Sequence, residues 1–446
     1  MNILVIGGGG REHAIIAALR RSPRVEKLWC APGNAGIAEL AACVDIKATD
    51  IPAVLSFCQR ENPDLVVVAP DDPLALGMVD ALEGAGFPAF GPTKAAAEIE
   101  GSKAFAKGLM ARHGIPTAAC RIFSDPAEAE GYIEACPLPV VVKADGLALG
   151  KGVFICHSRE EALDAVRSIM QDRMFGDAGR TVVIEEFLTG PEVSVLCFTD
   201  GSCIVPMPAA QDHKRAYAGD RGPNTGGMGA FTPVSVYTEE MAARCMKEIF
   251  LPTVRAMKEE GREFRGVLYF SLMLTQDGPR VIEYNCRFGD PETQAVLPLL
   301  ESDLLDVFLA VREGRLNGMP VRFADRSCCC VILASGGYPG AYPKGLPIFG
   351  VHEAESAGCA VYHAGTARKD GLLVTSGGRV LGVSAVSDTL PGAVAGAYAG
   401  IRKIAFHGAF YRQDIAQKDA AMGRRPGVSA PKRGADVRRG PQIDWS

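Results

Sequence analysis

The chain has 446 residues, of which 48% are hydrophobic and 22% are charged, and its formal net charge is -5 at pH 7. At roughly 150 residues per domain, this length predicts about three domains. No segment reaches the roughly 18 uninterrupted apolar residues that a membrane helix needs, and the acidic balance gives no general attraction for polyanions. We therefore expect neither a membrane nor a nucleic acid as a partner.

The N-terminus and the cysteines both indicate a reducing compartment. The first residues read MNILVIGGGG, which contains no basic leader and enters a strand-like run directly, so we expect a cytoplasmic protein. Fourteen cysteines occur between Cys30 and Cys359 without CxxC spacing. This pattern predicts buried thiols and argues against a zinc or iron–sulfur site.

Residues 1–102 alternate between apolar strand patterns and helix patterns, which predicts a Rossmann-like domain with a parallel sheet. We expect this domain to hold a substrate phosphate. The expected strands are 3–6, 27–30 and 65–69, and the expected helices are 12–19 and 75–83.

Residues 103–325 predict a second unit of α+β type, with a lid subdomain at about 120–190. The runs 266–275 and 280–284 should pair as a hairpin across the QDG turn, because strand-forming residues flank a short turn sequence. The other expected strands are 140–143, 153–156, 182–185 and 194–198, and a helix is expected at 160–170.

Residues 326–422 predict a small C-terminal cap domain of mixed α/β type, so the whole chain is expected to be an α/β and α+β multidomain protein. The expected strands are 328–334, 359–363, 372–375 and 380–386, followed by a helix at 391–405. The tail 423–446 is rich in Pro, Gly and Arg and poor in apolar residues, so we expect it to be disordered and dispensable for catalysis.

The first glycine cluster follows a predicted strand but does not fit a dinucleotide fingerprint. Glu12 occupies the third glycine position when counting from Gly7, and the second predicted strand runs into APG without an acidic residue. A glycine turn at a helix N-terminus can still hold a phosphate through backbone amides. We expect Gly9, Gly10, Arg11 and Asn34 to take part; the alternative is a merely tight turn.

A second glycine-rich segment reads VVVKADGLALGKG and places Lys143 at the end of an apolar strand. It is not a Walker A sequence, because Lys151 is followed by Gly152 instead of Ser or Thr. A strand lysine below a loop with Gly150, Lys151 and Gly152 suits ATP phosphates. A plain β-hairpin with solvated lysines remains the alternative for this segment alone.

Two further segments supply other parts of a nucleotide site. After the strand that ends at Glu185, the residues Glu186 to Leu188 offer backbone groups for adenine, and Glu192 follows to meet ribose hydroxyls. In VIEYNCRFGDPETQ, Glu283 and Asn285 are two apart on a strand and so face the same side.

Oxygen ligands in this arrangement suit Mg²⁺, which completes its octahedron with phosphates and water. Arg287 falls on the same face if the strand continues, where it would stabilise a phosphoryl group in transfer. A Glu-x-Asn pair alone is more often a pair of solvent-exposed side chains without a function. Here the arginine and the GDPE turn favour a magnesium site.

The histidines show no ligand spacing. We interpret His213 and His363 as hydrogen-bonded structural residues, since a lone histidine is weak evidence for catalysis. The cluster from Asp212 to Arg215 is either a solvated loop or a set of contacts to the charged groups of a substrate.

The order of these motifs resembles the ATP-grasp superfamily, and the individual sequences resemble the phosphoribosylamine glycine ligases over about residues 1–420. The segments that carry the resemblance are GGGGREHA, PGNAG, EGSKAFAK, VVKADGLALGKGV, QDHKR, GPNTGGMGA, NCRFGDPETQ, ASGGYPG and HAGT. The resemblance implies an N-terminal Rossmann-like domain, central ATP-grasp domains and a C-terminal cap.

The resemblance also implies roles for particular residues. The implied ATP contacts are Lys103, Lys143, Glu185, Leu188 and Glu192, and the implied metal ligands are Glu283 and Asn285. The implied substrate contacts lie in QDHKR and GPNTGGMG, at Asp212, Lys214, Asn224, Thr225, Gly226 and Gly227. The motifs themselves add Gly150, Lys151, Gly152 and Glu186 to the nucleotide site, and Gly9, Gly10, Arg11 and Asn34 to the substrate site. The expected catalytic residues are Arg287, Lys143 and Asp212.

Two departures from the family pattern stand out. Asp71 and Asp72 lie where relatives often carry a glutamate, which could alter contacts to a sugar phosphate. Phe270 and Ser271 replace small residues and could alter packing beside the metal strand.

The resemblance implies a ligase that joins glycine to 5-phosphoribosylamine with ATP and Mg²⁺, with Mn²⁺ as a substitute, in purine synthesis. No Ser/His/Asp or Cys/His arrangement is apparent, so ATP must activate the acyl group, as glycyl phosphate, and the loop 145–152 should close as a lid. We expect a monomer. The alternatives are another ATP-grasp ligase or carboxylase, and a non-catalytic nucleotide-binding protein.

Overall fold

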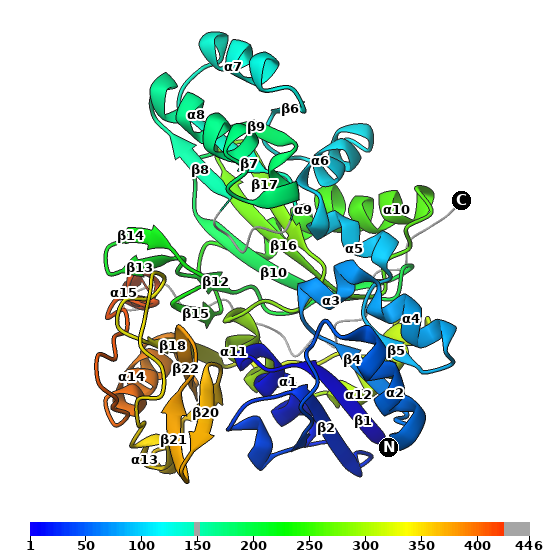
Figure 1. The fold of residues 1–446 in the computed structure, drawn as a ribbon, viewed down its shortest axis with the longest axis vertical. Coiled ribbons are helices and arrows are strands. Elements are labelled where there is room, and N and C mark those ends of the chain that lie inside the picture. Colours follow the sequence, from blue (N-terminus) through cyan, green and yellow to red (C-terminus); the bar gives the residue numbers. More distant parts are fainter. Residues whose placement is uncertain (147–151, 423–446) are drawn as a thin grey trace.

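The computed structural model describes residues 1–146 and 152–422 (Figure 1). It is a mixed α/β multidomain structure, as the sequence predicts. The predicted tail 423–446 lies outside the described residues. Within the described ranges, no helix is both long enough and apolar enough to cross a bilayer.

The N-terminal sheet is parallel, with strand order β3-β2-β1-β4-β5. Its central strands are buried apolar runs, which is typical of a sheet covered by helices on both faces. Its strands are β1 (Asn2–Gly7), β2 (Lys27–Pro32), β3 (Ala42–Cys43), β4 (Leu65–Val68) and β5 (Ala89–Phe90). Its helices are α1 (Gly10–Leu19), α2 (Ile51–Glu61), α3 (Asp71–Leu76), α4 (Met78–Gly84) and α5 (Lys94–Gly101).

The single helix expected at 75–83 is wrong in one respect, because two short helices occupy this region. Gly77 separates α3 from α4 with a φ of 90°. This left-handed conformation is readily adopted by glycine and ends the first helix.

A second sheet, of order β6-β9-β7-β8, is antiparallel and lies at the top of Figure 1. Helices α7 (Pro126–Ala135) and α8 (Arg159–Val166) pack on it through a separate hydrophobic cluster. Its strands are β6 (Cys120–Phe123), β7 (Val140–Ala144), β8 (Val153–Cys156) and β9 (Val182–Glu186). The helix expected at 160–170 ends as a π-helix, Arg167–Gln171.

The central sheet has the order β11-β10-β16-β17 and contains the predicted hairpin. Its strands are β10 (Glu192–Thr199), β11 (Ile204–Pro206), β16 (Gly266–Thr275) and β17 (Gly278–Asn285). Nearby helices are α6 (Lys103–Arg112), α9 (Glu239–Cys245), α10 (Leu251–Glu259), α11 (Glu292–Val296) and α12 (Leu304–Arg312).

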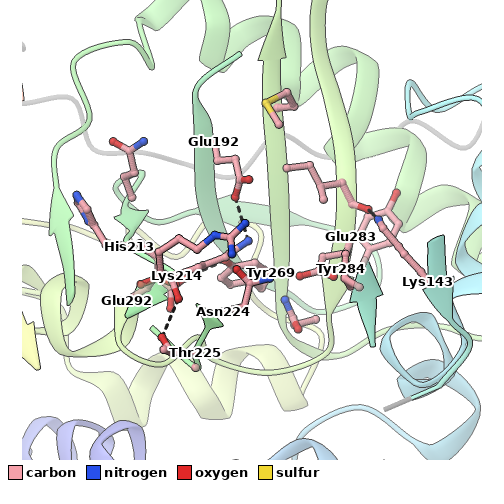
Figure 2. A pocket seen from close by; sticks show the side chains of 18 of the residues that line it. Lys143, Glu192, His213, Lys214, Asn224, Thr225, Tyr269, Glu283, Tyr284 and Glu292 are labelled. Carbon is pink, nitrogen blue, oxygen red and sulfur yellow. Dashed lines mark hydrogen bonds and ion pairs between the residues drawn. The ribbon is translucent and has the colours of Figure 1, made fainter. Parts of the chain in front are cut away.

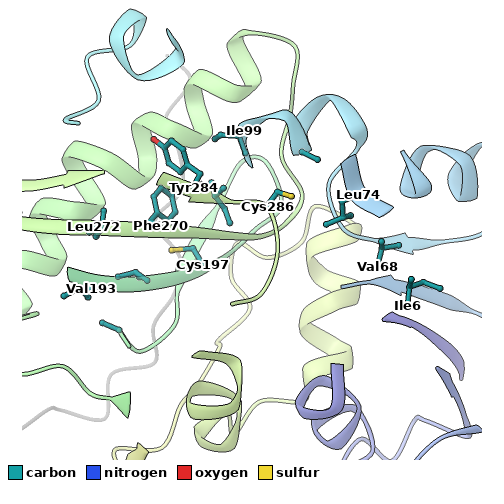
Figure 3. Close-up of a cluster of buried hydrophobic side chains, with 14 of the residues drawn as sticks. Ile6, Val68, Leu74, Ile99, Val193, Cys197, Phe270, Leu272, Tyr284 and Cys286 are labelled. Atoms are coloured by element: carbon teal, nitrogen blue, oxygen red, sulfur yellow. The ribbon is translucent and has the colours of Figure 1, made fainter. Parts of the chain in front are cut away.

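One continuous core joins the N-terminal sheet to the central sheet. Figure 3 shows Ile6 and Val68 of the parallel sheet in the same cluster as Phe270 and Tyr284 of the hairpin. Because interiors are close-packed, this core fixes the position of one sheet relative to the other.

The fourth sheet, of order β12-β15-β18-β22-β19, combines distant parts of the chain. Residues before the expected start of the cap at 326 contribute β12 (Gln211–Asp212) and β15 (Gly229–Thr232), and β15 pairs with β18. Its later strands are β18 (Ser327–Ala334), β19 (Ala360–His363) and β22 (Arg379–Ser387). Strands β20 (Thr366–Lys369) and β21 (Leu372–Thr375) form a separate two-stranded sheet. The remaining elements are β13 (Arg215–Tyr217), β14 (Arg221–Asn224), α13 (Val351–Ser356), α14 (Leu390–Ile401) and α15 (Gln417–Met422).

The prediction of buried thiols is confirmed for most cysteines. All fourteen are free, and only Cys43 is exposed and Cys120 half-buried. Burial raises the pKa of Cys203 to about 12, with a smaller contribution from Asp200, so this thiol is not reactive near neutral pH.

Candidate active site

A cavity of about 1090 Å³ opens beside the central sheet and collects residues from all parts of the chain. In Figure 2 its labelled side chains extend from His213 at the left of the view to Lys143 at the right. This volume is at the upper end of the range for small-molecule sites. The predicted site residues that line it are Arg11, Lys103, Lys143, Gly152, Glu185, Glu186, Leu188, Glu192, Asp212, Lys214, Asn224, Thr225, Gly226, Glu283, Asn285 and Arg287.

The Glu-x-Asn pair lies on edge strand β17, and both residues line the cavity, as their spacing predicts. Burial alone would raise the pKa of Glu283, but the charges of Lys214, Lys143 and Lys103 outweigh it and lower that pKa. Glu283 is therefore an ionised carboxylate under the influence of three lysines. This combination fits a hard divalent cation that is shared with phosphate groups.

Lys143 forms a buried network with a lysine that the sequence analysis did not identify. Its Nζ lies 3.0 Å from Oε1 of Glu185, and Nζ of Lys107 lies 3.0 Å from Oε2 of the same carboxylate. All three side chains are no more than 5% exposed. The carboxylate of Glu185 is therefore used to hold two lysines at the cavity wall.

Lys107 had a usable signal in the sequence. It follows Lys103 by four residues on α6, and this spacing places both on one face of a helix. Nζ of Lys103 donates to the backbone oxygen of Gly146 at 2.8 Å. Asp145 accepts from the backbone N–H of Ala104 at 3.0 Å, so the start of the glycine-rich loop is attached to α6.

Part of the predicted phosphate loop falls outside the described residues, namely Gly150 and Lys151 within the segment 147–151. The lid expected at 145–152 is therefore described only at its two ends. Strands β7 and β8 on either side of it pair antiparallel, and Lys143 pairs with Val153.

The segment after β9 reaches the cavity wall at Leu188. The side chain of Glu186 has partners within the protein, because its Oε1 accepts from the backbone N–H of Ala119 at 2.9 Å and from Arg280 at 3.0 Å. Glu192 makes an ion pair with Lys214 at 3.0 Å (Figure 2).

Arg287 does not lie on the same strand as Glu283, because β17 ends at Asn285. Its guanidinium instead bridges carboxylates from the N-terminal region, with Glu100 at 2.7 Å and Asp71 at 3.7 Å. It also donates to Oδ1 of Asn285 at 3.1 Å. Glu100 and Asp71, which lie about 190 positions or more earlier in the chain, thus hold the arginine beside Asn285.

Asp71, a departure from the family pattern, is part of this arrangement. Burial by itself would raise its pKa, but Arg287 and Arg11 lower it. Phe270, the other departure, packs in the core against Phe250 at 4.4 Å between ring centroids, and Ser271 pairs with Glu283 across the hairpin.

The loop that follows β14 is held by residues of the C-terminal region. Gly226 donates its N–H to the hydroxyl of Tyr338 at 3.0 Å and accepts from Arg379 at 2.7 Å. These contacts orient Asn224 and Thr225 at the cavity wall. Gly227 lies next to Asp212 but does not line the cavity.

The first glycine turn, at Gly7 to Gly10, packs against Gln294 and the segment at Asn34. The N–H of Gly9 donates to Oε2 of Glu12 at 2.6 Å, and a Cβ at Gly10 would lie 2.6 Å from Nε2 of Gln294. Asn34 donates to backbone oxygens of Gly8 and His363. The structure does not bring Gly9, Gly10 or Asn34 into the cavity lining; Arg11 does line it.

The two histidines have different environments. The side chain of His363 is within hydrogen-bond distance of Thr366 at 3.1 Å, as expected of a structural residue. His213 lines the cavity, and its buried Nδ1 has no hydrogen-bond partner among the described residues. Burial and the charge of Arg412 lower the pKa of His213 to about 4, so the ring is neutral near pH 7.

Three further cavity residues were not predicted from the sequence: Tyr269, Glu292 and Arg379. Tyr269 belongs to an apolar strand, so its sequence pattern predicts a core residue. Arg379 begins β22, far in the sequence from the predicted site residues. Glu292 is the last residue of the GDPE turn, which the sequence analysis noted without assigning this glutamate a role.

Three models of one family, described as phosphoribosylglycinamide synthetase, match the chain. The N domain matches residues 1–100, the ATP-grasp (A) domain 101–293 and the C domain 328–418. Together they extend over most of the sequence.

Individual relatives show the same likeness. A phosphoribosylamine–glycine ligase of Rhizobium meliloti is 50% identical over 421 residues, covering 94% of this chain and 99% of the relative. The trifunctional purine biosynthetic protein adenosine-3 of Gallus gallus is 48% identical over 98% of this chain, which spans only 44% of that protein's length. A crystal structure of a phosphoribosylamine–glycine ligase from Thermotoga maritima has a TM-score of 0.83 at 34% identity, covering 93% of this chain and 100% of that one.

Proposed function

This chain belongs to the phosphoribosylglycinamide synthetase family of ATP-grasp proteins, and from that premise we propose that it is a phosphoribosylamine–glycine ligase. It joins glycine to 5-phosphoribosylamine and converts ATP to ADP and phosphate, giving glycinamide ribonucleotide for purine synthesis. The observation that carries the proposal is Glu283, ionised by three lysines of the cavity and placed beside Asn285.

The lysines and the Glu-x-Asn pair support binding of a nucleotide with a divalent cation. Lys103 and Lys143 would face the phosphates, with Leu188 beside the base. Glu283 and Asn285 would hold Mg²⁺, which when bound neutralises phosphate charge. Mn²⁺ accepts the same oxygen ligands and can substitute for it.

In the proposed reaction, a carboxylate oxygen of glycine attacks the γ-phosphorus of ATP. A carboxyl–phosphate bond forms, the bond to the β-phosphate oxygen breaks, and ADP leaves. The amine of phosphoribosylamine then attacks the carbonyl carbon of glycyl phosphate, releasing phosphate as the amide forms and the nitrogen loses a proton to solvent.

The protein's own part in this chemistry is positioning and charge neutralisation. Lys143 is fixed by Glu185, and Arg287 is fixed by Glu100 beside the metal pair. Side chains that are held in place before the reaction need little reorganisation as charge develops on the transferred phosphoryl group. Arg287 would supply its free Nε, which has no partner among the described residues.

A substrate panel tests the proposal. ADP release should require glycine together with ribose 5-phosphate and ammonia, which generate phosphoribosylamine in solution. ADP release that depends instead on bicarbonate and another acid would identify an ATP-grasp carboxylase. Tight ATP binding without turnover on any substrate would identify a nucleotide-binding protein that is not an enzyme.

The setting of the enzyme is part of the same proposal. We propose a cytoplasmic monomer whose partners are these small substrates. Size-exclusion chromatography with light scattering should give the mass of one chain, 47.2 kDa. A mass near twice that value would contradict the monomer.

A further inference from the structure

Arg412 is a buried arginine that does not line the cavity, and no step of the proposed reaction uses it. Its side chain is 1% exposed, and its guanidinium faces the hairpin of β13 and β14. We propose that Arg412 is a positioning residue, which fixes this hairpin and through it the cavity residues Asn224 and Thr225. The inference rests on the proposed function, because the cavity is the active site under that proposal.

The hairpin is not part of a larger sheet. Among the described strands, β13 and β14 pair only with each other, and Figure 1 shows them beside α15 at the edge of the molecule. Most of the residues from 217 to 223 are exposed. A hairpin of two strands is at best marginally stable in water. Its position must therefore come from contacts with other parts of the protein.

Arg412 supplies two of these contacts at once. Its guanidinium donates to Oδ1 of Asp220 at 2.9 Å and to the backbone oxygen of Arg215 at 3.1 Å. Asp220 lies in the turn between the two strands, and Arg215 begins β13. The planar guanidinium can donate in several fixed directions, which a lysine ammonium cannot reproduce. One side chain thus fixes both the turn and the first strand of the hairpin.

Asp414 holds the guanidinium in this orientation. Its two carboxylate oxygens accept from Nε and Nη2 of Arg412 at 2.8 and 2.7 Å, which is a bidentate pair. Oδ2 of Asp414 also accepts from the backbone N–H of Gly219 at 2.9 Å, so this carboxylate contacts the turn directly. Burial alone would raise the pKa of Asp414, but the hydrogen bonds from Arg412 and Gly219 lower it. Asp414 is therefore ionised near neutral pH and pairs with the arginine.

The segment that carries Arg412 is itself attached to the C-terminal sheet. Phe410 and Ala334, the last residue of β18, exchange two backbone hydrogen bonds at 2.8 and 3.0 Å. The backbone oxygen of Arg412 accepts from the hydroxyl of Tyr398 at 2.8 Å. Tyr398 belongs to α14, which packs on β18 and β22. The guanidinium is therefore carried by a rigid support, whereas the hairpin that it contacts is not.

The hairpin leads directly to the wall of the cavity. Arg215, whose backbone oxygen accepts from Arg412, pairs with Asn224 across the hairpin. The next residue, Thr225, donates its hydroxyl to the backbone oxygen of Lys214 at 2.8 Å. Asn224 and Thr225 both line the cavity. A hairpin that tilts after the loss of Arg412 therefore moves two residues of the wall, and a displacement of about 1 Å at a site can cost on the order of 100-fold in rate.

The variant Arg412→Ala removes every contact of the guanidinium. The KM for glycine or for phosphoribosylamine should rise roughly 10-fold, because the cavity wall is no longer held in place. The KM for ATP should stay within about 3-fold, because Glu185 fixes Lys143 independently of the hairpin. A purely structural role would instead reduce the amount of active protein, which lowers kcat and leaves each KM unchanged. Arg402→Ala, at an exposed arginine that ends α14, is the matched control and should leave every constant unchanged.

The variant Asp220→Asn tests the same contact from the hairpin, and it replaces Arg412→Ala if the latter does not fold, as judged by circular dichroism. Asp220 is exposed and has a φ of 55°, a left-handed conformation that asparagine also adopts readily, so the turn is retained. The same KM should rise by a smaller factor, because Asp414 still holds the arginine. In the double variant, the KM should equal that of Arg412→Ala, since the shared contact is lost only once.

Limited proteolysis measures the position of the hairpin without any substrate. Trypsin should cleave after Arg215 or Arg221 roughly 10-fold faster in Arg412→Ala than in wild type, because a backbone that opens locally is cleaved more readily. Mass spectrometry of the fragments identifies the cleaved bond.

Unchanged cleavage of the hairpin in a folded variant would overturn the inference. An unchanged KM for both glycine and phosphoribosylamine, or an equal rise in the KM for ATP, would overturn it as well. A wild-type protein that releases ADP without any need for glycine would overturn the proposed function, whereas the cleavage rates would still report whether Arg412 holds the hairpin. The two failures are therefore distinguished.

Discussion

The two ends of the cavity handle buried charge in opposite ways. At the lysine end, Glu185 is placed between Lys143 and Lys107, with both N–O distances at 3.0 Å. At the other end, Asp212 and Glu292 have only neutral donors or no partner among the described residues. Charge that is already paired maintains the shape of the site, whereas buried charge without a partner marks the place where a ligand supplies it.

Glu283 is influenced by lysines from both ends of the cavity. Lys214, Lys143 and Lys103 together lower the pKa of Glu283, against the effect of burial. An ionised oxygen at this point can hold a cation without losing its attraction to the surrounding lysines. We expect the largest effects of mutation here.

Replacing Glu283 removes the group common to both ends. Glu283→Ala should lower kcat for glycine-dependent ADP release by roughly 100- to 1,000-fold, because phosphate charge is no longer neutralised by a held cation. Lys143→Ala should have a similar effect. A folded Glu283→Ala protein with turnover within about 10-fold of wild type would remove this residue from the site.

Breaking the paired end should affect stability more than chemistry. Glu185→Gln leaves Lys143 and Lys107 buried without their shared anion, which should cost about 3 kcal/mol of unfolding free energy. Calorimetry should show a lower Tm. Glu128→Gln, at an exposed carboxylate on α7, is the control and should leave Tm nearly unchanged. An equal Tm for Glu185→Gln and wild type would show that the ion pairs do not stabilise this end.

At the other end, removing the charge of Asp212 should raise the unfolding free energy instead of lowering it. Because the folded-state pKa of Asp212 is raised, the folded protein holds its proton more tightly than the unfolded chain does. Stability is therefore lost as pH rises from the ordinary pKa of about 4 through the raised value. Asp212→Asn cannot ionise and should increase the unfolding free energy at pH 8 by about 1 kcal/mol in the absence of ligand.

That gain should shrink toward pH 4, where Asp212 is protonated in the unfolded chain as well as in the folded protein. Thermal unfolding at a series of pH values measures the difference between the two proteins. A constant difference across the series would contradict a raised pKa for Asp212.

The smallest effect is expected at the rim of the lysine end. Glu186 pairs with Arg280 at 3.0 Å, and their side chains are 45% and 31% exposed, so solvent screens the pair. Glu186→Gln should change the KM for ATP by less than about 3-fold, and its Tm should match that of wild type within error. A loss of ATP affinity of 10-fold or more would place Glu186 in direct contact with the nucleotide.

Much of the fold could be predicted from local patterns. Apolar runs marked the buried strands, and the QDG turn marked the hairpin that carries Glu283 and Asn285. The prediction was wrong at Gly77, which divides an expected single helix into two. The strands were predicted correctly because side-chain periodicity in the local sequence determines strand and helix patterns. The boundary at Gly77 was missed because periodicity does not show where a helix is interrupted.

The partners of buried charges could not be predicted in the same way. The sequence placed Arg287 on the metal strand, but folding brings Glu100 and Asp71 to it. Nothing near Tyr269 in the sequence distinguishes it from a core residue, yet its hydroxyl supports Glu292.

The sequence by itself therefore determined the types and order of the elements, the family resemblance and the Glu-x-Asn pair, because each depends on residues close together in the chain. Only the tertiary structure decided which lysines share Glu185, which carboxylates hold Arg287, and that neither Asp212 nor Glu292 has an ion-pair partner among the described residues. Electrostatic partners depend on distance in space and on the loss of water, and a linear sequence contains neither.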